Sequence, residues 1–180
     1  MADNDQLFPI VAIGASAGGL EAISTFLENV PPDLGMAYVI IQHLSPTHES
    51  ILPEILERKT SMKVYQVTNG IGVQPDSVYV IPPNAYMRIV DHRLTLSAVE
   101  KHRTGIHSID YFLCSLAPIY QNNAIAVILS GTASDGTEGI RAIKAEGGIT
   151  LPRTKVQNSP GCLKVRSIAV TSILSCHLRK

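Results

Sequence analysis

Short apolar segments alternate with amphipathic segments along most of this chain, and this alternation constrains its fold more than any other feature. The apolar segments have strand length and are rich in β-branched residues: 8–13, 36–41, 78–81 and 124–129. The segments between them repeat apolar residues at helical spacing: 20–30, 50–57, 108–119 and 137–146. Such alternation is typical of a parallel sheet covered on both faces. The sequence therefore predicts an α/β fold with a doubly wound, mostly parallel sheet and helices on both faces.

Four shorter stretches complete the predicted elements. Residues 63–67 alternate as a strand, and residues 149–150 begin another strand after the glycine pair that ends the preceding helix. Residues 87–90 and 93–98 flank a two-residue turn and predict a hairpin. No internal repeat or linker interrupts this pattern, so we expect a single domain.

Composition excludes several classes of protein. With 180 residues, of which 45% are hydrophobic and 17% charged, the chain can bury a core and is not a disordered polymer. No apolar run approaches the ~18 residues of a membrane-spanning helix, so no membrane insertion is expected. Residues 1–6 are polar and acidic, unlike a secretory signal, and we therefore expect a cytoplasmic protein.

The cysteines do not indicate a disulfide framework or a zinc site. Cys114, Cys162 and Cys176 are odd in number, far apart and without a Cys-x-x-Cys pair. Cys114 lies among apolar helix positions, so we expect it in the core. No metal and no cofactor is expected from these spacings.

Charge is divided sharply between two parts of the chain. Residues 1–150 hold nine Lys and Arg against all fifteen Asp and Glu, a net charge of −6. Residues 151–180 hold the other six basic residues and no acidic residue, a net charge of +6. The basic residues of 1–150 do not cluster, which argues against a nucleic-acid partner. We interpret 1–150 as the domain and 151–180 as an atypical basic tail.

The first turn that can carry chemistry is Gly-Ala-Ser-Ala-Gly-Gly at residues 14–19, between a predicted strand and a predicted helix. Its G-x-S-x-G pattern matches a nucleophile elbow, in which flanking glycines let a sharply turned serine project above the sheet. Ser16 would then be the nucleophile. A phosphate-binding turn at a helix N-terminus and a plain tight turn explain the same residues equally well.

Two further turns follow apolar strands. His43 comes directly after the strand 36–41 and Gln42, and a histidine there serves either structure or catalysis. Asp135 lies in a small polar turn after the strand 124–129. A structural explanation is that Asp135 or Ser134 caps the helix that follows.

Taken together, these turns indicate a site. Parallel sheets bind ligands outside the carboxyl ends of their strands, where Ser16, His43 and Asp135 are all expected. Serine, histidine and aspartate can act as nucleophile, general base and orienting acid. Their order along the chain is Ser, His, Asp, whereas α/β-hydrolases have the order Ser, Asp, His. The elbow pattern therefore does not assign the chain to that family.

Four segments resemble the catalytic domain of the chemotaxis methylesterase (CheB) family. They occur in the family's order over about 140 residues: VAIGASAGGLEA at 11–22, VIIQHLSP at 39–46, VIPPN at 80–84 and VILSGTASDGT at 127–137. The resemblance implies a doubly wound parallel sheet. It also implies a serine hydrolase that removes methyl groups from glutamyl esters of chemoreceptors and that can deamidate glutamine.

The resemblance also assigns roles to individual residues. It implies Ser16 as nucleophile, His43 as base and Asp135 as orienting acid. The backbone N–H groups of Ala17 and Thr132 are candidate oxyanion donors. The partners implied are the cytoplasmic helices of methylated chemoreceptors and a methyltransferase domain or protein. Residues 102–107 form a polar loop that the resemblance places near the substrate rim, and we interpret this stretch as a solvated loop.

Two features depart from the family. Many members place a phospho-accepting receiver domain before the esterase, whereas seven residues precede the first predicted strand here, so we expect no built-in phosphorylation switch. The opening is more like hybrids that begin with the esterase domain and continue into a methyltransferase. The family pattern also ends near Thr150 in this chain.

The tail is the second departure. Members continue with patterns like Thr-x-Ala-Gln-Asp, Pro-Gly-Met-Pro and Leu-Pro-Pro, which are absent from residue 151 onward. Allowed codons for this stretch, read one nucleotide earlier, can spell Phe-Ala-Gln-Asp-Glu-Ser-Ser-Lys-Phe-Pro-Gly-Met-Pro. We therefore predict a frameshift near Thr150, an incomplete domain and a poorly packed tail. The alternative is a genuine divergent basic tail.

Two other functions remain open on the sequence. A truncated or decayed esterase domain could act only as a non-catalytic binding module. The glycine turn at 14–19 could also belong to a phosphate-binding α/β protein.

Overall fold

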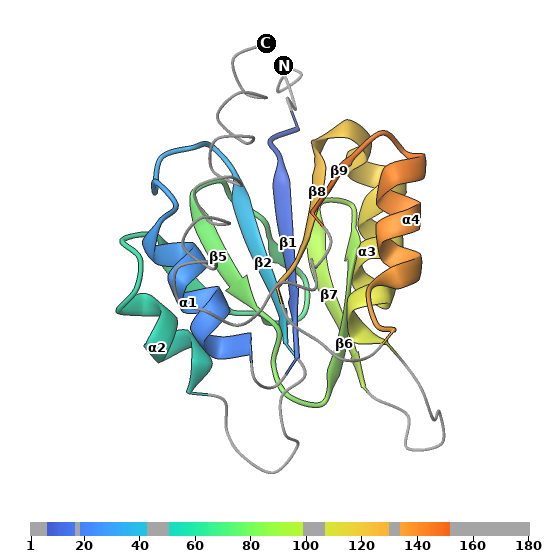
Figure 1. The fold of residues 1–180 in the computed structure, drawn as a ribbon. Coiled ribbons are helices and arrows are strands. Elements are labelled where there is room, and N and C mark those ends of the chain that lie inside the picture. Colours follow the sequence, from blue (N-terminus) through green and yellow to red (C-terminus); the bar gives the residue numbers. More distant parts are fainter. Residues whose placement is uncertain (1–6, 17–18, 43–50, 99–106, 130–133, 152–180) are drawn as a thin grey trace, which may run out of the picture.

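The computed structural model describes residues 7–16, 19–42, 51–98, 107–129 and 134–151. A parallel sheet of six strands forms its centre, in the order β3-β5-β2-β1-β8-β9 (Figure 1). Its strands are β1 (Ile10–Ala15), β2 (Ala37–Gln42), β3 (Lys63–Gln66), β5 (Ser77–Val80), β8 (Ala124–Ile128) and β9 (Ile149–Leu151). The α/β prediction with a doubly wound parallel sheet is confirmed.

The chain reverses its direction of winding at β1. From β1 it passes through a helix to β2, continues to β3 at one edge and returns to β5 between β3 and β2, whereas β8 and β9 add to the other side of β1. The register pairs Ala15 with Gln42 and Gly14 with Ile128, so β2, β1 and β8 end at the same level. A crevice outside such a reversal is where doubly wound sheets place their sites.

Two helices cover one face of the sheet, α1 (Leu20–Glu28) and α2 (Leu52–Glu57). Figure 1 shows both in front of the left part of the sheet. Phe26 and Leu27 of α1 and Leu56 of α2 pack against alternate residues of the strands in one buried cluster. Removing each such side chain from water stabilises the fold by about 1.5–3 kcal/mol.

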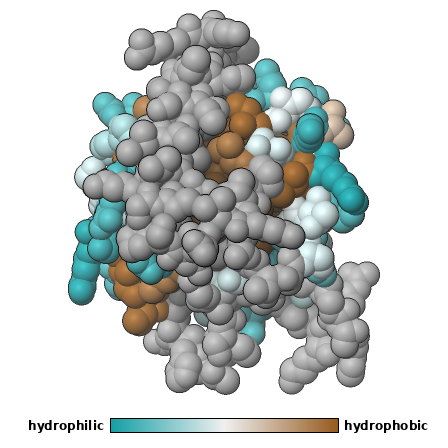
Figure 2. Space-filling model, viewed as in Figure 1, coloured by the Kyte–Doolittle hydropathy of each residue, from teal (hydrophilic) through white to brown (hydrophobic). Residues whose placement is uncertain are grey.

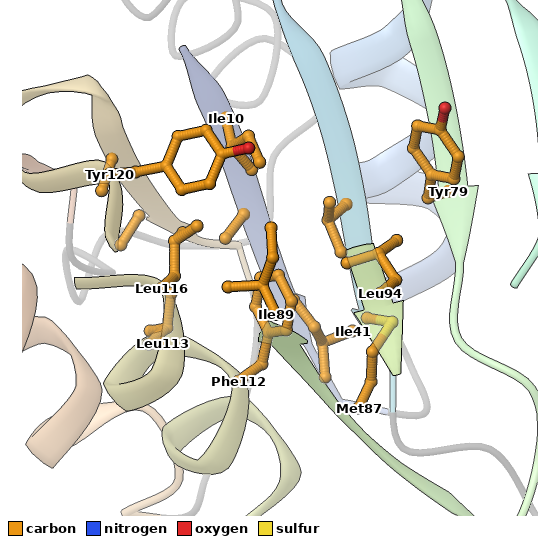
Figure 3. Close-up of a cluster of buried hydrophobic side chains, with 14 of the residues drawn as sticks. Ile10, Ile41, Tyr79, Met87, Ile89, Leu94, Phe112, Leu113, Leu116 and Tyr120 are labelled. Carbon is orange, nitrogen blue, oxygen red and sulfur yellow. The ribbon is translucent and has the colours of Figure 1, made fainter. Parts of the chain in front are cut away.

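The other face is covered by α3 (Ser108–Tyr120), α4 (Thr137–Ala145) and a small antiparallel sheet. The small sheet has the order β4-β7-β6 and comprises β4 (Ile71–Gly72), β6 (Ala85–Val90) and β7 (Arg93–Ala98). A short 3₁₀ helix, η2 (Gln121–Asn123), joins α3 to β8. Figure 3 shows Phe112 and Leu116 of α3 beside Ile89 of β6 in this second cluster.

Three details differ from the sequence prediction. β4 and η2 were not predicted, because two or three residues carry no periodicity that a sequence pattern can show. The prediction that Cys114 is buried is wrong, since its side chain is exposed. Leu151 belongs to β9 and pairs with Val127, whereas the rest of the predicted tail lies outside the residues that the structure describes.

The outer surface near the helices is partly apolar and partly hydrophilic. Figure 2 shows apolar surface at the lower left, where Figure 1 places α2, and hydrophilic side chains along the right-hand edge near α4. On α4, Arg141 and Glu138 form an exposed ion pair at 2.6 Å, which contributes little to stability. Within the part of the chain that the structure describes, none of the helices has both the length and the hydropathy needed to cross a bilayer.

Close packing of α4 on α3 depends on Gly139. A Cβ atom at this position would lie 2.5 Å from Cβ of Leu113, a separation that real side chains do not adopt. Alanine by itself favours a helix over glycine by about 1 kcal/mol, so the two effects oppose each other. We expect Gly139→Ala to lower the free energy of unfolding by about 1–3 kcal/mol, because the clash forces the helices apart.

Denaturant unfolding of the variant measures this effect, with Gly72→Ala as the matched control. The nearest atom to a Cβ at Gly72 is Nη1 of Arg93 at 3.8 Å, which is ordinary contact. Gly72→Ala is therefore expected to change stability by less than about 0.5 kcal/mol. A Gly139→Ala protein that is more stable than the parent would contradict the packing described here.

Candidate active site

Ser16 stands directly after β1, at the carboxyl end of the central strand. Its backbone carbonyl accepts a hydrogen bond from the N–H of Gly19 at 2.8 Å and another from Nε2 of Gln42 at 3.2 Å. The first bond closes the turn into α1, and the second ties that turn to the last residue of β2. The half-buried Ser16 is therefore held at a fixed place on the rim of the sheet.

Gly14 lets the start of α3 approach this turn. A Cβ at Gly14 would lie 2.8 Å from Cδ1 of Ile128 and 2.9 Å from Cδ1 of Ile109. The same two isoleucines lie 3.0 to 3.6 Å from the position of a Cβ at Gly136, which has a φ of +96°. Both glycines are thus required by close packing at the point where β1, β8, α3 and α4 converge.

Asp135 lies at this convergence, with its side chain only 10% exposed. Its Oδ2 accepts the backbone N–H of Ile109 at 3.2 Å, and its Oδ1 accepts that of Asp110 at 3.0 Å. Both donors are in the first turn of α3, where the helix dipole also favours a negative charge. The carboxylate is therefore held in one orientation by main-chain atoms.

Asp110 makes the reciprocal contact. Its Oδ1 accepts the N–H of Gly139 in the first turn of α4 at 2.7 Å. The sequence suggested that Asp135 or Ser134 caps the helix that follows, α4. Instead, the side chain of Asp135 caps α3, and α4 takes its side-chain cap from Asp110. The Ser134 backbone carbonyl accepts the N–H of Thr137 at 3.1 Å. A carboxylate from the turn before α4 thus caps α3, and a carboxylate from α3 caps α4.

His107 makes contacts that the interpretation of residues 102–107 as a solvated loop did not predict. It precedes α3, and its Nδ1 lies 3.7 Å from Oδ1 of Asp135 and 3.7 Å from Oδ2 of Asp110. Its side chain is only 34% exposed, which is less than a solvated loop implies. No local pattern could have revealed this cluster, since its members come from positions 107, 110 and 135.

An open depression of about 560 Å³ adjoins the cluster. Its lining includes His107 and Asp110 together with Arg88, Cys114 and Glu138. Partial desolvation of the exposed Cys114 raises the pKa of its thiol, and the carboxylates of Asp110 and Glu138 raise it further. Because the thiolate is the nucleophilic form, Cys114 is a poor candidate for a nucleophile at neutral pH.

The structure describes only part of the site inferred from the sequence. Ser16 and Asp135 are described, whereas Ala17, His43 and Thr132 lie outside the described residues. Gln42, which precedes His43 in the sequence, pairs with Ala15, which precedes Ser16. The three proposed catalytic residues thus follow three adjacent strands, β1, β2 and β8.

Comparison with known proteins connects this geometry to a family. Residues 11–160 match the family model described as CheB methylesterase. A protein of Leptospira interrogans named "Putative protein-glutamate methylesterase/protein-glutamine glutaminase" is 29% identical over 92% of this chain and 86% of its own length. A relative from Photorhabdus laumondii, named as a protein-glutamate methylesterase/protein-glutamine glutaminase, is 32% identical over 79% of this chain and 41% of its own length.

A solved structure shows the same fold. The Thermotoga maritima CheB methylesterase catalytic domain superposes with a TM-score of 0.76 at 24% sequence identity. The match covers 93% of this chain and 97% of that one. At this identity the likeness supports the architecture rather than the chemistry.

Proposed function

Since this chain belongs to the CheB methylesterase family, we propose that it is a serine hydrolase that demethylates glutamyl methyl esters of chemoreceptors and releases methanol. Relatives from several organisms carry the name protein-glutamate methylesterase/protein-glutamine glutaminase. The substrate class is inferred from the names of these relatives, whereas the mechanism is derived from the residues of this chain.

The observation that carries the proposal is that the neighbouring strands β2, β1 and β8 end at the same level of the sheet. The ends of these neighbouring strands, Ala15, Gln42 and Ile128, lie at one edge of the sheet, which supports a site formed by residues that follow them in the sequence. Ser16 and Asp135 belong to turns fixed by main-chain hydrogen bonds. Preorganised groups of this kind need little rearrangement in the transition state.

In the first step, His43 accepts the proton of the Ser16 hydroxyl as Oγ attacks the ester carbonyl carbon. The carbonyl oxygen becomes an oxyanion, for which the N–H groups of Ala17 and Thr132 are the proposed donors. His43 then gives its proton to the methoxy oxygen. The bond between this oxygen and the former carbonyl carbon breaks, and methanol leaves. An acyl ester between the receptor glutamate and Ser16 remains.

In the second step, His43 takes a proton from water, and the hydroxide attacks the acyl ester. Collapse of the second tetrahedral intermediate returns the proton to Ser16 and frees the glutamate carboxylate. Asp135 fixes the tautomer of His43 and stabilises the imidazolium in both steps. The N–H groups of α3 hold the Asp135 carboxylate for this role. Ammonia leaves in place of methanol if the substrate is glutamine.

The partners proposed are the cytoplasmic helices of methylated receptors, with the protein acting in the cytoplasm. A methyltransferase must supply the substrate, because glutamyl methyl esters are the product of methyl transfer to a carboxylate. That methyltransferase can be a separate protein or a further domain.

Methanol release from a methylated receptor fragment tests the proposal. The full chain is expected to release methanol faster than buffer alone and to lower the mass of the receptor by one methylene per methylated site. Two chains should be compared in the same assay: one with residues 151–180 of this sequence, and one in which the tail is translated in the reading frame before the predicted frameshift. Failure of both to release methanol from methylated receptor would overturn the proposed function.

A further inference from the structure

Three ligand-type side chains gather beside the proposed catalytic residues. Nδ1 of His107 and one carboxylate oxygen each of Asp110 and Asp135 all lie within 4.8 Å of one another. The cluster joins the residue before α3, the first turn of α3 and the turn before α4. Packing of the two helices at Gly139 holds these segments together.

The separations within the cluster are too long for hydrogen bonds and suit a bridging ion. Nδ1 of His107 lies 3.7 Å from an oxygen of each carboxylate, and this atom is buried without a hydrogen-bond partner. Ligands of tetrahedral zinc, with bonds of ~2.0–2.1 Å, are separated by about 3.4 Å. Small side-chain rotations would therefore bring the three atoms into the coordination sphere of one ion.

The donor set discriminates among metals. One imidazole nitrogen with two carboxylate oxygens suits zinc, whereas magnesium prefers oxygen ligands alone in octahedral geometry. Oδ2 of Asp135 and Oδ1 of Asp110 accept N–H groups of α3 and α4, which orient the ligands as outer-shell partners do in metal sites, and Oδ1 of Asp135, which faces His107, also accepts the N–H of Asp110. The adjoining depression leaves room for a water ligand.

The charges around the depression permit a cation. Its lining contains the carboxylates of Asp110 and Glu138 against the single guanidinium of Arg88. Asp135 adds a further carboxylate from the turn before α4. Because Glu138 is itself paired with Arg141, the excess of negative charge that a divalent ion would meet comes from Asp110 and Asp135.

We propose that His107, Asp110 and Asp135 form a zinc-binding site whose occupation inhibits the esterase. Zinc bound to Asp135 withdraws this carboxylate from the imidazole it is proposed to orient, so the ion acts as an inhibitor rather than as a cofactor. The inhibitory part rests on the proposed function of Asp135, whereas the binding part does not.

Calorimetric titration of the metal-free full chain with Zn²⁺ tests the binding part. One ion per chain is expected, and His107→Asn should weaken binding at least tenfold, since even outer-shell substitutions cost about 10–100-fold in affinity. His92→Asn is the matched control: His92 lies in the β6–β7 turn with a φ of 59°, a conformation that asparagine tolerates. Mg²⁺ at the same concentration is expected to leave the titration unchanged.

The outcomes separate the two parts of the proposal. Absence of a bound Zn²⁺, or equal affinity in His107→Asn and the parent, would overturn the site. Methanol release should fall on addition of Zn²⁺ in the parent and much less in His107→Asn, each compared with its own metal-free rate. Binding at His107 without inhibition would overturn the role of zinc as inhibitor. Should the chain lack esterase activity altogether, the titration still decides whether the site exists.

Discussion

Replacing Ser16 with alanine is expected to reduce methanol release at least about 10⁴-fold, to the level that binding and oxyanion donors alone can supply. The variant lacks the hydroxyl that forms the acyl ester. Its fold should be preserved, because the hydrogen bonds given above for Ser16 are accepted by its backbone carbonyl, which alanine retains. Radiolabelled methanol from methylated receptor gives the rate, and thermal unfolding gives the stability.

Ser97→Ala is the matched control for this experiment. Ser97 is exposed on β7 in the small antiparallel sheet, so its replacement should leave both rate and unfolding temperature close to those of the parent. A Ser16→Ala protein that is folded and releases methanol at the parental rate would remove Ser16 from the mechanism.

Asp135→Asn should produce the second large effect, a loss of about 10³–10⁴-fold in kcat. The amide has no negative charge to stabilise an imidazolium. It also presents an N–H₂ group where the carboxylate accepted a backbone N–H of α3, so one helix cap is lost. The cap is worth about 0.5–2 kcal/mol, and about 1 kcal/mol corresponds to ~2–4 °C in Tm for a chain of this size.

Asp110→Ala separates the two roles of Asp135, because alanine removes the oxygen that accepts the N–H of Gly139, whereas asparagine would keep one there. Asp110 caps α4 as Asp135 caps α3, so its substitution should lower Tm by a similar amount. Its rate should fall only in proportion to the loss of folded protein. Equal losses of rate in the two variants would mean that Asp135 acts through helix capping alone.

The central strands could be predicted from the sequence because burial on both faces makes them continuous apolar runs. β1 was expected at residues 8–13 and occupies Ile10–Ala15, all of it buried. The glycines and the serine at its end mark the turn. Ser16 and Asp135 were proposed as site residues for a similar reason, since polar turns that follow apolar strands are conspicuous in a sequence; their catalytic roles stay predictions.

Contacts between helices could not be predicted in this way. The bonds from α3 to Asp135 join residues 25 and 26 positions apart, and the bond from Gly139 to Asp110 spans 29. The close packing of α4 on α3, where Leu113 lies against Gly139, is likewise a long-range contact that periodicity does not encode. Cys114 is different, because the buried stripe of α3, with Leu113 and Leu116, leaves position 114 on the solvent side, so a finer helical projection would have placed it correctly.

The most direct measurement is the site of reaction with a fluorophosphonate, which bonds covalently to an activated serine. Mass spectrometry of the treated full chain should find one adduct, on Ser16, and the adduct should form far more slowly after His43→Ala. An adduct on a different serine, or none on a folded chain, would contradict the claim that Ser16 is the nucleophile of this protein.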